Sequence, residues 1–91
     1  MNRIGCYRLA QNVAIRPERF GALVYNYDNR QLYFIHSHVV AEFMAGLDGG
    51  RPLGQAIEQF VAQRALPASA ADTLLHTVGQ LERIGIVRAV A

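Results

Sequence analysis

The sequence predicts an α+β fold in which a three-stranded antiparallel sheet is followed by a bundle of three helices. Residues 8–36 are rich in Val, Ile, Leu, Tyr and Phe and are interrupted by turn residues, a texture typical of strands. Residues 37–84 instead carry apolar side chains at helical spacing. Because strands and helices are segregated along the chain, an α+β arrangement is favoured over alternating units.

The first part of the chain predicts three strands. The first is expected over residues 8–15 and ends at a loop over residues 16–19, because Pro17 lacks a backbone donor. The second strand is expected over residues 20–27, and the third over residues 31–36.

The segment Asp28-Asn29-Arg30 joins the last two predicted strands. Asp and Asn tolerate the left-handed backbone conformations that tight connections require. The second and third strands are therefore predicted to form a hairpin.

Two helices are expected to follow. Ser37 precedes a run with helical periodicity, so its hydroxyl is expected to cap the first helix. Asp48-Gly49-Gly50 is expected to end that helix, because glycine adopts a positive φ freely. Pro52 suits the first turn of the second helix, which Leu66-Pro67-Ala68 then breaks.

A third helix is expected to begin at residues 69–72 (Ser-Ala-Ala-Asp), which resemble a capping box with Asp in place of Glu. Gly85 is expected to end this helix, and residues 86–88 to form a short tail strand. The apolar stripe of the helix runs through Leu74, Val78 and Leu81.

Length and composition limit the classes to which the protein can belong. The 91 residues fit one domain over residues 1–91, because domains typically run from roughly 50 to 250 residues. A net charge of +2 is too small to indicate nucleic-acid binding. Cys6 is the single cysteine, so no internal disulfide is expected. Since no apolar run suits a signal peptide or a membrane span, we expect a cytoplasmic protein.

No residue set in the sequence points to catalysis or metal binding. The glycines of residues 46–54 lack the following Lys-Ser or Lys-Thr of a phosphate loop. His36 and His38 form an H-x-H pair, but a stable metal site needs three or four ligands. The other candidate ligands, His76 and Cys6, lie far away in the sequence and do not form a metal-binding motif with this pair. We therefore expect no enzymatic activity and no metal site.

The segment Leu32–Ile35 is apolar on both faces of its predicted strand, with Leu32 and Phe34 pointing one way and Tyr33 and Ile35 the other. A strand covered on one face alternates apolar with polar residues. Two interpretations remain open. Either the helices and chain ends cover both faces of this strand, or the strand is an edge that receives an extended peptide. Gln31–Ile35 carries neither charge nor proline to protect such an edge.

Three segments resemble, in this order, the PqqD-like peptide-recognition family (RiPP recognition elements). They are the hairpin FGALVYNYDNRQLYFIHS, the helix ending in LDGGRPL, and the final LERIGIV. The likeness covers residues 8–88. Within the family, RPERFGALVYN followed by LYFIHS is most similar to the mycofactocin precursor-peptide chaperones.

The resemblance implies a winged-helix-like domain that acts as a non-catalytic chaperone without a cofactor. It implies that the leader of a ribosomally made precursor peptide pairs antiparallel with the third strand, in a groove against the third helix. Carried over to this sequence, the peptide-binding residues are Gln31, Leu32, Tyr33, Phe34, Ile35, Leu75, Val78 and Glu82. The sequence leaves open whether the helix flank of Leu75 or that of Thr77 and Ile84 lines the groove.

The mycofactocin branch implies a precursor peptide ending in Val-Tyr and a radical S-adenosylmethionine maturase as partners, with neither nucleic acid nor membrane. Uncovered strand edges also allow a homodimer. The alternative is a winged-helix nucleic-acid-binding or regulatory domain. Its recognition helix would need several basic or amide side chains, and the predicted third helix carries Arg83 and Gln80 alone.

Overall fold

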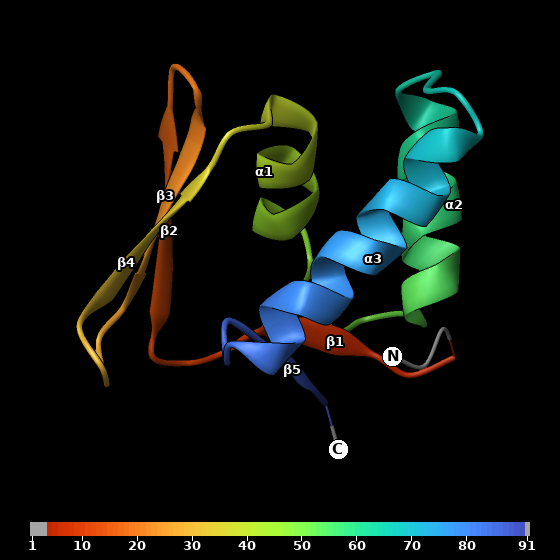
Figure 1. Ribbon diagram of the computed structural model, residues 1–91. Coiled ribbons are helices and arrows are strands. Elements are labelled where there is room, and N and C mark those ends of the chain that lie inside the picture. The colour runs from red at the N-terminus through yellow and green to blue at the C-terminus, as the bar shows by residue number, and fades with distance from the viewer. Residues whose placement is uncertain (1–3, 91) are drawn as a thin grey trace.

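Residues 4–90 contain a three-stranded antiparallel sheet, a small two-stranded sheet and three helices, which confirms the predicted α+β class (Figure 1). The computed structural model describes residues 4–90. The sheet has the order β2 (Val13–Glu18), β3 (Gly21–Asn26), β4 (Gln31–Ile35), so β3 is central. The helices all lie on one side of this sheet (Figure 1).

The first predicted strand, over residues 8–15, is in fact two strands. β1 (Tyr7–Leu9) ends before a bend at residues 10–12, and β2 begins after it. The Tyr27 amide donates to the Asn12 carbonyl at 2.8 Å, which fixes the bend against the end of β3. The prediction missed the break because Leu9, Val13 and Ile15 keep one parity across it.

The loop predicted at residues 16–19 is also wrong, because β2 runs through Pro17 to Glu18 and pairs with β3 over this whole length. Only Arg19 and Phe20 connect the two strands. Proline fits here because an edge strand turns alternate amides toward solvent, where a missing N–H breaks no bond within the sheet.

The hairpin of β3 and β4 is confirmed, with residues 27–30 as its connection. The left-handed residue is Arg30 (φ 58°), and not the Asp or Asn of the turn. The buried Asn26 accepts the amide of Asp28 with its side-chain oxygen at 3.0 Å, and the side-chain amide of Asn12 at 2.9 Å. Asparagine therefore organises this turn through its side chain.

Helix α1 (His38–Ala45) begins as the sequence predicts, because the Val40 amide donates to the Ser37 hydroxyl oxygen at 3.2 Å. It ends at Gly46, before the predicted terminus at residues 48–50. Helix α2 (Leu53–Gln63) follows Pro52 directly.

Helix α3 (Ser69–Arg83) lacks the predicted capping box. Ala68 occupies the N-cap position in a helical conformation and makes no side-chain cap bond, so Ser69 already lies inside the helix. The Thr73 hydroxyl donates back to the Ser69 carbonyl at 3.2 Å. Helical turns made by residues 67–71 thus satisfy the first amides without a polar cap, since Ala70 and Ala71 donate to Pro67 and Ala68.

The predicted tail strand is present as β5 (Val87–Ala89), which pairs antiparallel with β1. Gly85, at a φ of 83°, turns the chain from α3 into it. The Ala10 amide donates to the Ile86 carbonyl at 2.9 Å, so the end of α3 is tied to the bend that leads into β2.

One hydrophobic core lies between the sheet, the helices and the small β1–β5 pair. The sheet contributes Val24, which is fully buried at the centre of β3. The core consists of Tyr7, Val24, Val40, Phe43, Met44, Leu53, Ile57, Leu74, Val78, Leu81, Ile86 and Val87.

Gly21 is the tightest point of the sheet, since its φ is 145° and a Cβ would lie 2.1 Å from the Ile35 carbonyl oxygen. We expect Gly21→Ala to lower the free energy of unfolding by about 3 kcal/mol, because a strained backbone costs about 1–3 kcal/mol and the clash adds to it. Urea denaturation measures this. Gly46→Ala is the matched control, because the nearest atom to its Cβ is 3.8 Å away. Equal midpoints for the two variants would contradict the assignment.

Candidate functional site

The free edge of β4 is the feature that the sequence singled out. β4 pairs with β3 along one side, and within residues 4–90 no strand pairs with its other side. The small sheet of β1 and β5 is separate from it. β4 is thus an edge strand, and the exposed Leu32 and Phe34 show that one of its faces is not covered; that the edge receives a peptide stays a prediction.

The register decides which main-chain groups of β4 face outward. Arg19 and Phe20 form a two-residue turn, whose flanking residues Glu18 and Gly21 pair with each other. Hydrogen-bonded pairs alternate along an antiparallel ladder, so the next residue, Ala22, directs its N–H and C=O toward β4. Val24 has the same parity and does likewise.

On β4 the partners of Ala22 and Val24 are Ile35 and Tyr33, which therefore point their main-chain groups back into the sheet. The position of the Ile35 carbonyl oxygen, 2.1 Å from an ideal Cβ on Gly21, agrees with this direction. Leu32 and Phe34 have the opposite parity. Their N–H and C=O groups consequently face away from β3, along the open edge.

The opposite edge of the sheet, on β2, carries a proline that β4 lacks. Pro17 pairs with Ala22, whose main chain points away from β2, so the nitrogen of Pro17 lies on the outer side of β2. Proline there offers no donor to an incoming strand and protects that edge. β4 has no equivalent residue, so β4 is the edge open to pairing.

The side chains of β4 divide as the sequence predicts. Tyr33 and Ile35 are half-buried and pack against the core, whereas Leu32 and Phe34 are 48% and 57% exposed on the other face. Gln31 is exposed at the start of the strand. A strand that pairs with this edge would thus meet apolar side chains on both of its faces.

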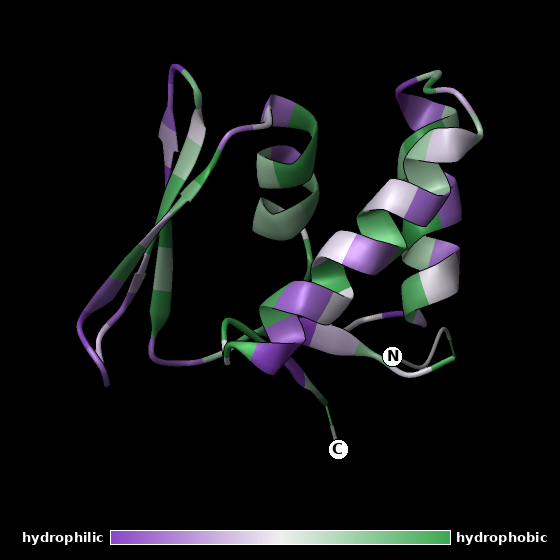
Figure 2. Cartoon of the chain, viewed as in Figure 1, coloured by the Kyte–Doolittle hydropathy of each residue, from purple (hydrophilic) through white to green (hydrophobic). Residues whose placement is uncertain are grey.

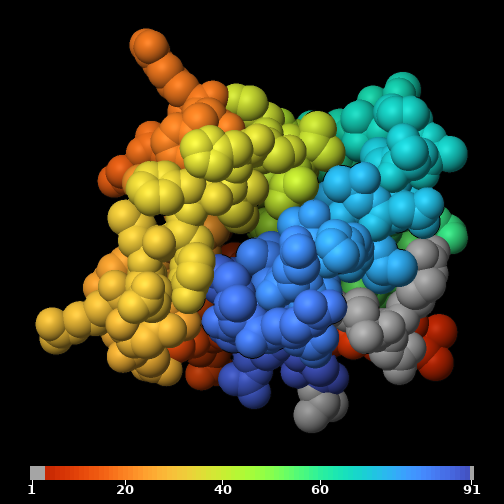
Figure 3. All heavy atoms as spheres, viewed as in Figure 1, coloured from red at the N-terminus to blue at the C-terminus, as the bar shows by residue number. Residues whose placement is uncertain are grey.

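The helix residues named from the resemblance have unequal exposure. Leu75 and Glu82 of α3 are half-buried, and Leu75 packs against the core. Val78 is 1% exposed and belongs to the core itself. β4 and the C-terminal half of α3 appear on the same face of the molecule (Figure 3).

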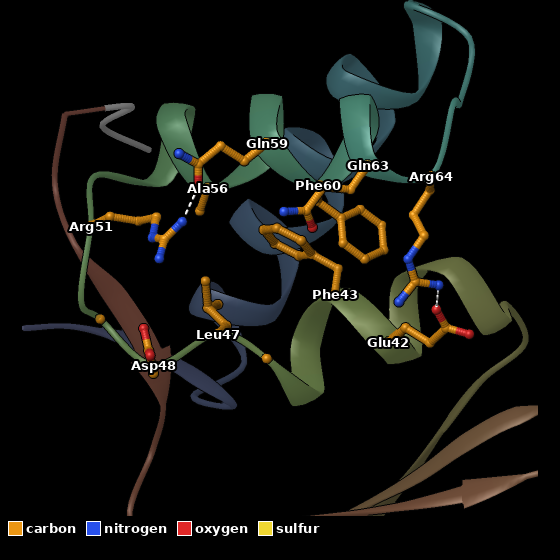
Figure 4. Close-up of a pocket in the computed structure, with 12 residues that line it drawn as sticks. Glu42, Phe43, Leu47, Asp48, Arg51, Ala56, Gln59, Phe60, Gln63 and Arg64 are labelled. Carbon is orange, nitrogen blue, oxygen red and sulfur yellow. Dashed lines mark hydrogen bonds and ion pairs between the residues drawn. The ribbon is translucent and has the colours of Figure 1, made fainter.

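Two cavities lie elsewhere on the helical side of the sheet. The larger, of about 340 Å³, lies between α1 and α2 over Phe43 and Phe60, with Arg51 and Arg64 at its two ends (Figure 4). The smaller, of about 220 Å³, lies between β2, the start of β3 and α1. Neither is lined by residues of β4 or α3. The predicted groove is therefore not one of these cavities.

Sequence reasoning missed the residues that surround Phe34 on the exposed face. The rings of Phe20 and His36 lie 5.8 and 6.2 Å from that of Phe34, and 5.1 Å from each other. Tyr25 and Tyr27 form an edge-to-face pair at 4.8 Å. The period of two along residues 20–27 could have placed Tyr25 and Tyr27 on this face, because their parity is opposite to that of Val24. Phe20 has the parity of Val24 and lies in the turn, so no alternation pattern indicated its contact with Phe34.

The described residues hold no group of three or more His, Cys, Asp or Glu side chains that could bind a metal ion. Likewise, none of the helices described is both long and apolar enough to cross a membrane.

Comparison with known proteins identifies a family for this chain. The family model described as "Peptide chaperone MftB family" matches residues 6–88. A curated protein named "Peptide chaperone MftB", from Mycolicibacterium smegmatis (strain ATCC 700084 / mc(2)155), is 44% identical over 41 residues, which are 45% of this chain and 40% of that protein. No solved structure matches the chain, and the winged-helix likeness stays a prediction.

The register of β4 can be tested on the protein without a bound peptide. We expect the amides of Leu32 and Phe34 to exchange with deuterium at least tenfold faster than those of Tyr33 and Ile35, because only the latter donate within the sheet. Hydrogen exchange followed by NMR measures each amide separately, and the alternate residues of one strand serve as controls for each other. Uniform protection along β4 would show that its edge is covered.

Proposed function

The chain belongs to the peptide chaperone MftB family, and we propose that it binds the leader of a precursor peptide by adding a peptide strand to the edge of β4. The observation that carries this proposal is the open edge. Leu32 and Phe34 direct their main-chain groups outward, and the competing edge on β2 is protected by Pro17. Strand addition uses such groups for attachment and neighbouring side chains for selectivity.

Main-chain pairing alone is too weak for specific binding. The N–H and C=O groups of Leu32 and Phe34 allow about four hydrogen bonds, worth about 4 kcal/mol in total. Micromolar affinity requires about 8 kcal/mol after the peptide has been ordered. Burial of roughly 200–300 Å² of apolar surface contributes about 5–7 kcal/mol and closes the difference.

The apolar surface is available beside the edge on the helical face. Tyr33 and Ile35 are half-buried there, and Leu75 packs against the same core. Glu82 lies two turns further along α3 and is also half-buried. We propose that residues 31–35 with Leu75 and Glu82 form the peptide-binding surface, while Val78 supports it from the core.

In this proposal the chain is a non-catalytic cytoplasmic chaperone without a cofactor. It binds the precursor peptide and presents it to a radical S-adenosylmethionine maturase. Holding the peptide on a carrier that also contacts the enzyme raises the local concentration of substrate and fixes its register.

A substitution at Phe34 isolates the main-chain contribution. Phe34→Pro removes the outward N–H, whereas Phe34→Ala removes the same ring and keeps the N–H. We expect the dissociation constant for the precursor peptide to be at least tenfold higher for Phe34→Pro than for Phe34→Ala, because a hydrogen bond is lost and the proline ring obstructs the incoming strand. Isothermal titration calorimetry on folded variants measures both constants.

Equal affinities of these two variants would contradict strand addition at β4. Tyr33 and Ile35 do not suit this test, since proline at either position would break the pairing with β3 and perturb the fold.

A second substitution tests the flank of α3. We expect Leu75→Glu to weaken peptide binding by about tenfold or more, because a charge replaces apolar contact beside the bound strand. Arg64→Glu on α2 is the control, since Arg64 lies at the far cavity over the ring of Phe60. Thermal melts confirm folding of each variant. A larger loss for Arg64→Glu would move the peptide site to the cavity between α1 and α2.

A further inference from the structure

The open edge of β4 is chemically symmetric about its own centre. Tyr33 is the middle residue of the five in Gln31–Ile35, and the outward main-chain groups belong to the residues on either side of it, Leu32 and Phe34. Figure 2 shows hydrophobic residues along most of β4 and hydrophilic residues at the turn before it. An edge of this kind complements a second copy of itself in an antiparallel pair with two-fold symmetry.

One register of such a pair uses every outward group of the strand. When Tyr33 lies opposite Tyr33 of the second copy, Leu32 lies opposite Phe34 of the second copy, and the reverse. Each of these pairs joins two residues whose N–H and C=O groups face outward, so the interface gains about four hydrogen bonds. A shift by one residue sets outward groups against inward ones and forms none. A shift by two leaves part of β4 beyond the end of its partner.

We propose that two copies of this chain associate through β4 in this register and thereby cover the peptide-binding edge, an inference that rests on the proposed function. The side chains suit the pairing, because directly opposed residues share a side of the sheet. Tyr33 meets its own copy on the helical face, and Leu32 meets Phe34 of the second copy on the other. Gln31–Ile35 carries no charge, so no like charges oppose each other within the pair.

The proline on β2 limits this association to two copies. If β2 of one copy added to β4 of the next, repetition of that contact would build an open chain of molecules. Pro17 has no N–H on the outer side of β2, which disfavours that contact. The symmetric pair instead joins two three-stranded sheets in the order β2-β3-β4-β4-β3-β2. Both outer edges of the joined sheet then carry Pro17.

The short length of β4 makes the pair weak. At about 3.4 Å per residue the strand spans about 17 Å, and a sheet is about 10 Å thick, so the contact covers roughly 170 Å² in cross-section. A stable complex buries about 800 Å² on each partner. The monomer therefore predominates in dilute solution, and a precursor peptide competes with the second copy for the same main-chain groups.

The competition has a calculable size. At a total chain concentration ten times the dissociation constant of the dimer, about one fifth of the chains are monomers. Because only the monomer offers a free edge, the apparent dissociation constant for the peptide is then about fivefold higher than in dilute solution.

Cysteine cross-linking measures the register of the pair. Leu32→Cys and Phe34→Cys are prepared separately with Cys6→Ser, which removes the native thiol. Directly paired residues have Cα atoms about 5.5 Å apart, which a disulfide spans, whereas each residue and its own copy are two positions out of line and lie more than about 7 Å apart. With oxidised glutathione as oxidant, we expect the mixture of the two variants to give at least tenfold more linked dimer than either variant alone.

The linked dimer then tests whether the pair covers the peptide-binding edge. Its linked and reduced forms carry the same side chains, so the reduced form is the control for both substitutions. We expect the linked dimer to bind a labelled precursor peptide from the same genome at least tenfold more weakly than the reduced mixture, as measured by fluorescence anisotropy.

The wild-type chain gives the same information without substitutions. We expect its mass in sedimentation equilibrium to rise above 10.1 kDa as concentration increases, and saturating precursor peptide to return it to one chain with one peptide. The amides of Leu32 and Phe34 exchange rapidly only in the monomer, so their exchange slows as the chain concentration rises.

The outcomes separate this inference from the proposed function. A mixture that links no better than either variant alone, or a wild-type mass of one chain at every concentration, overturns the inference while peptide binding is unaffected. A linked dimer that binds the peptide as tightly as its reduced form contradicts the proposed site on β4 and the masking of that site, whereas the self-pairing stands. A wild-type chain that binds no precursor peptide at any concentration contradicts the proposed function.

Discussion

Burial of one face of a three-stranded sheet under helices is the constraint on which the rest of this structure depends. Ala22 and Val24 of the central strand are fully buried, and α1 packs over that strand. A strand that shifted by one residue would turn these side chains to solvent and Leu23 to the core, so the register is fixed by burial. The same register determines which groups remain exposed, both along the edge of β4 and on the face of the sheet opposite the helices.

The ends of the chain determine where the helices lie on that buried face. β5 follows α3 after a glycine turn and pairs with β1, which leads through a short bend into β2. The bond from the Ala10 amide to the Ile86 carbonyl joins the end of α3 to this bend. Because contacts between residues so far apart in sequence fix the geometry, α3 is held on the face of the molecule that also presents β4 (Figure 3).

Pro17 and the alternating direction of the main-chain groups make the two edges of the sheet different. Two edges exist, yet Pro17 removes the donor that an incoming strand would need at one of them. The other edge offers outward main-chain groups at two positions with apolar side chains. The proposal that a peptide strand adds to β4 rests on this difference between the two edges.

Local sequence signals by themselves determined the α+β class, the β3–β4 hairpin, the Ser37 cap and the tail strand, because hydrophobic period, turn residues and caps act over a few residues. They also predicted that the side chains of Leu32 and Phe34 lie on one face of the strand and those of Tyr33 and Ile35 on the other. The break after Leu9, the strand through Pro17 and the absence of a polar cap on α3 were decided by tertiary structure, since each depends on a partner distant in sequence. Only the folded sheet decided that β4 is an edge and that its outward main-chain groups belong to Leu32 and Phe34. Strand order and exposure come from packing between segments, which no local pattern encodes.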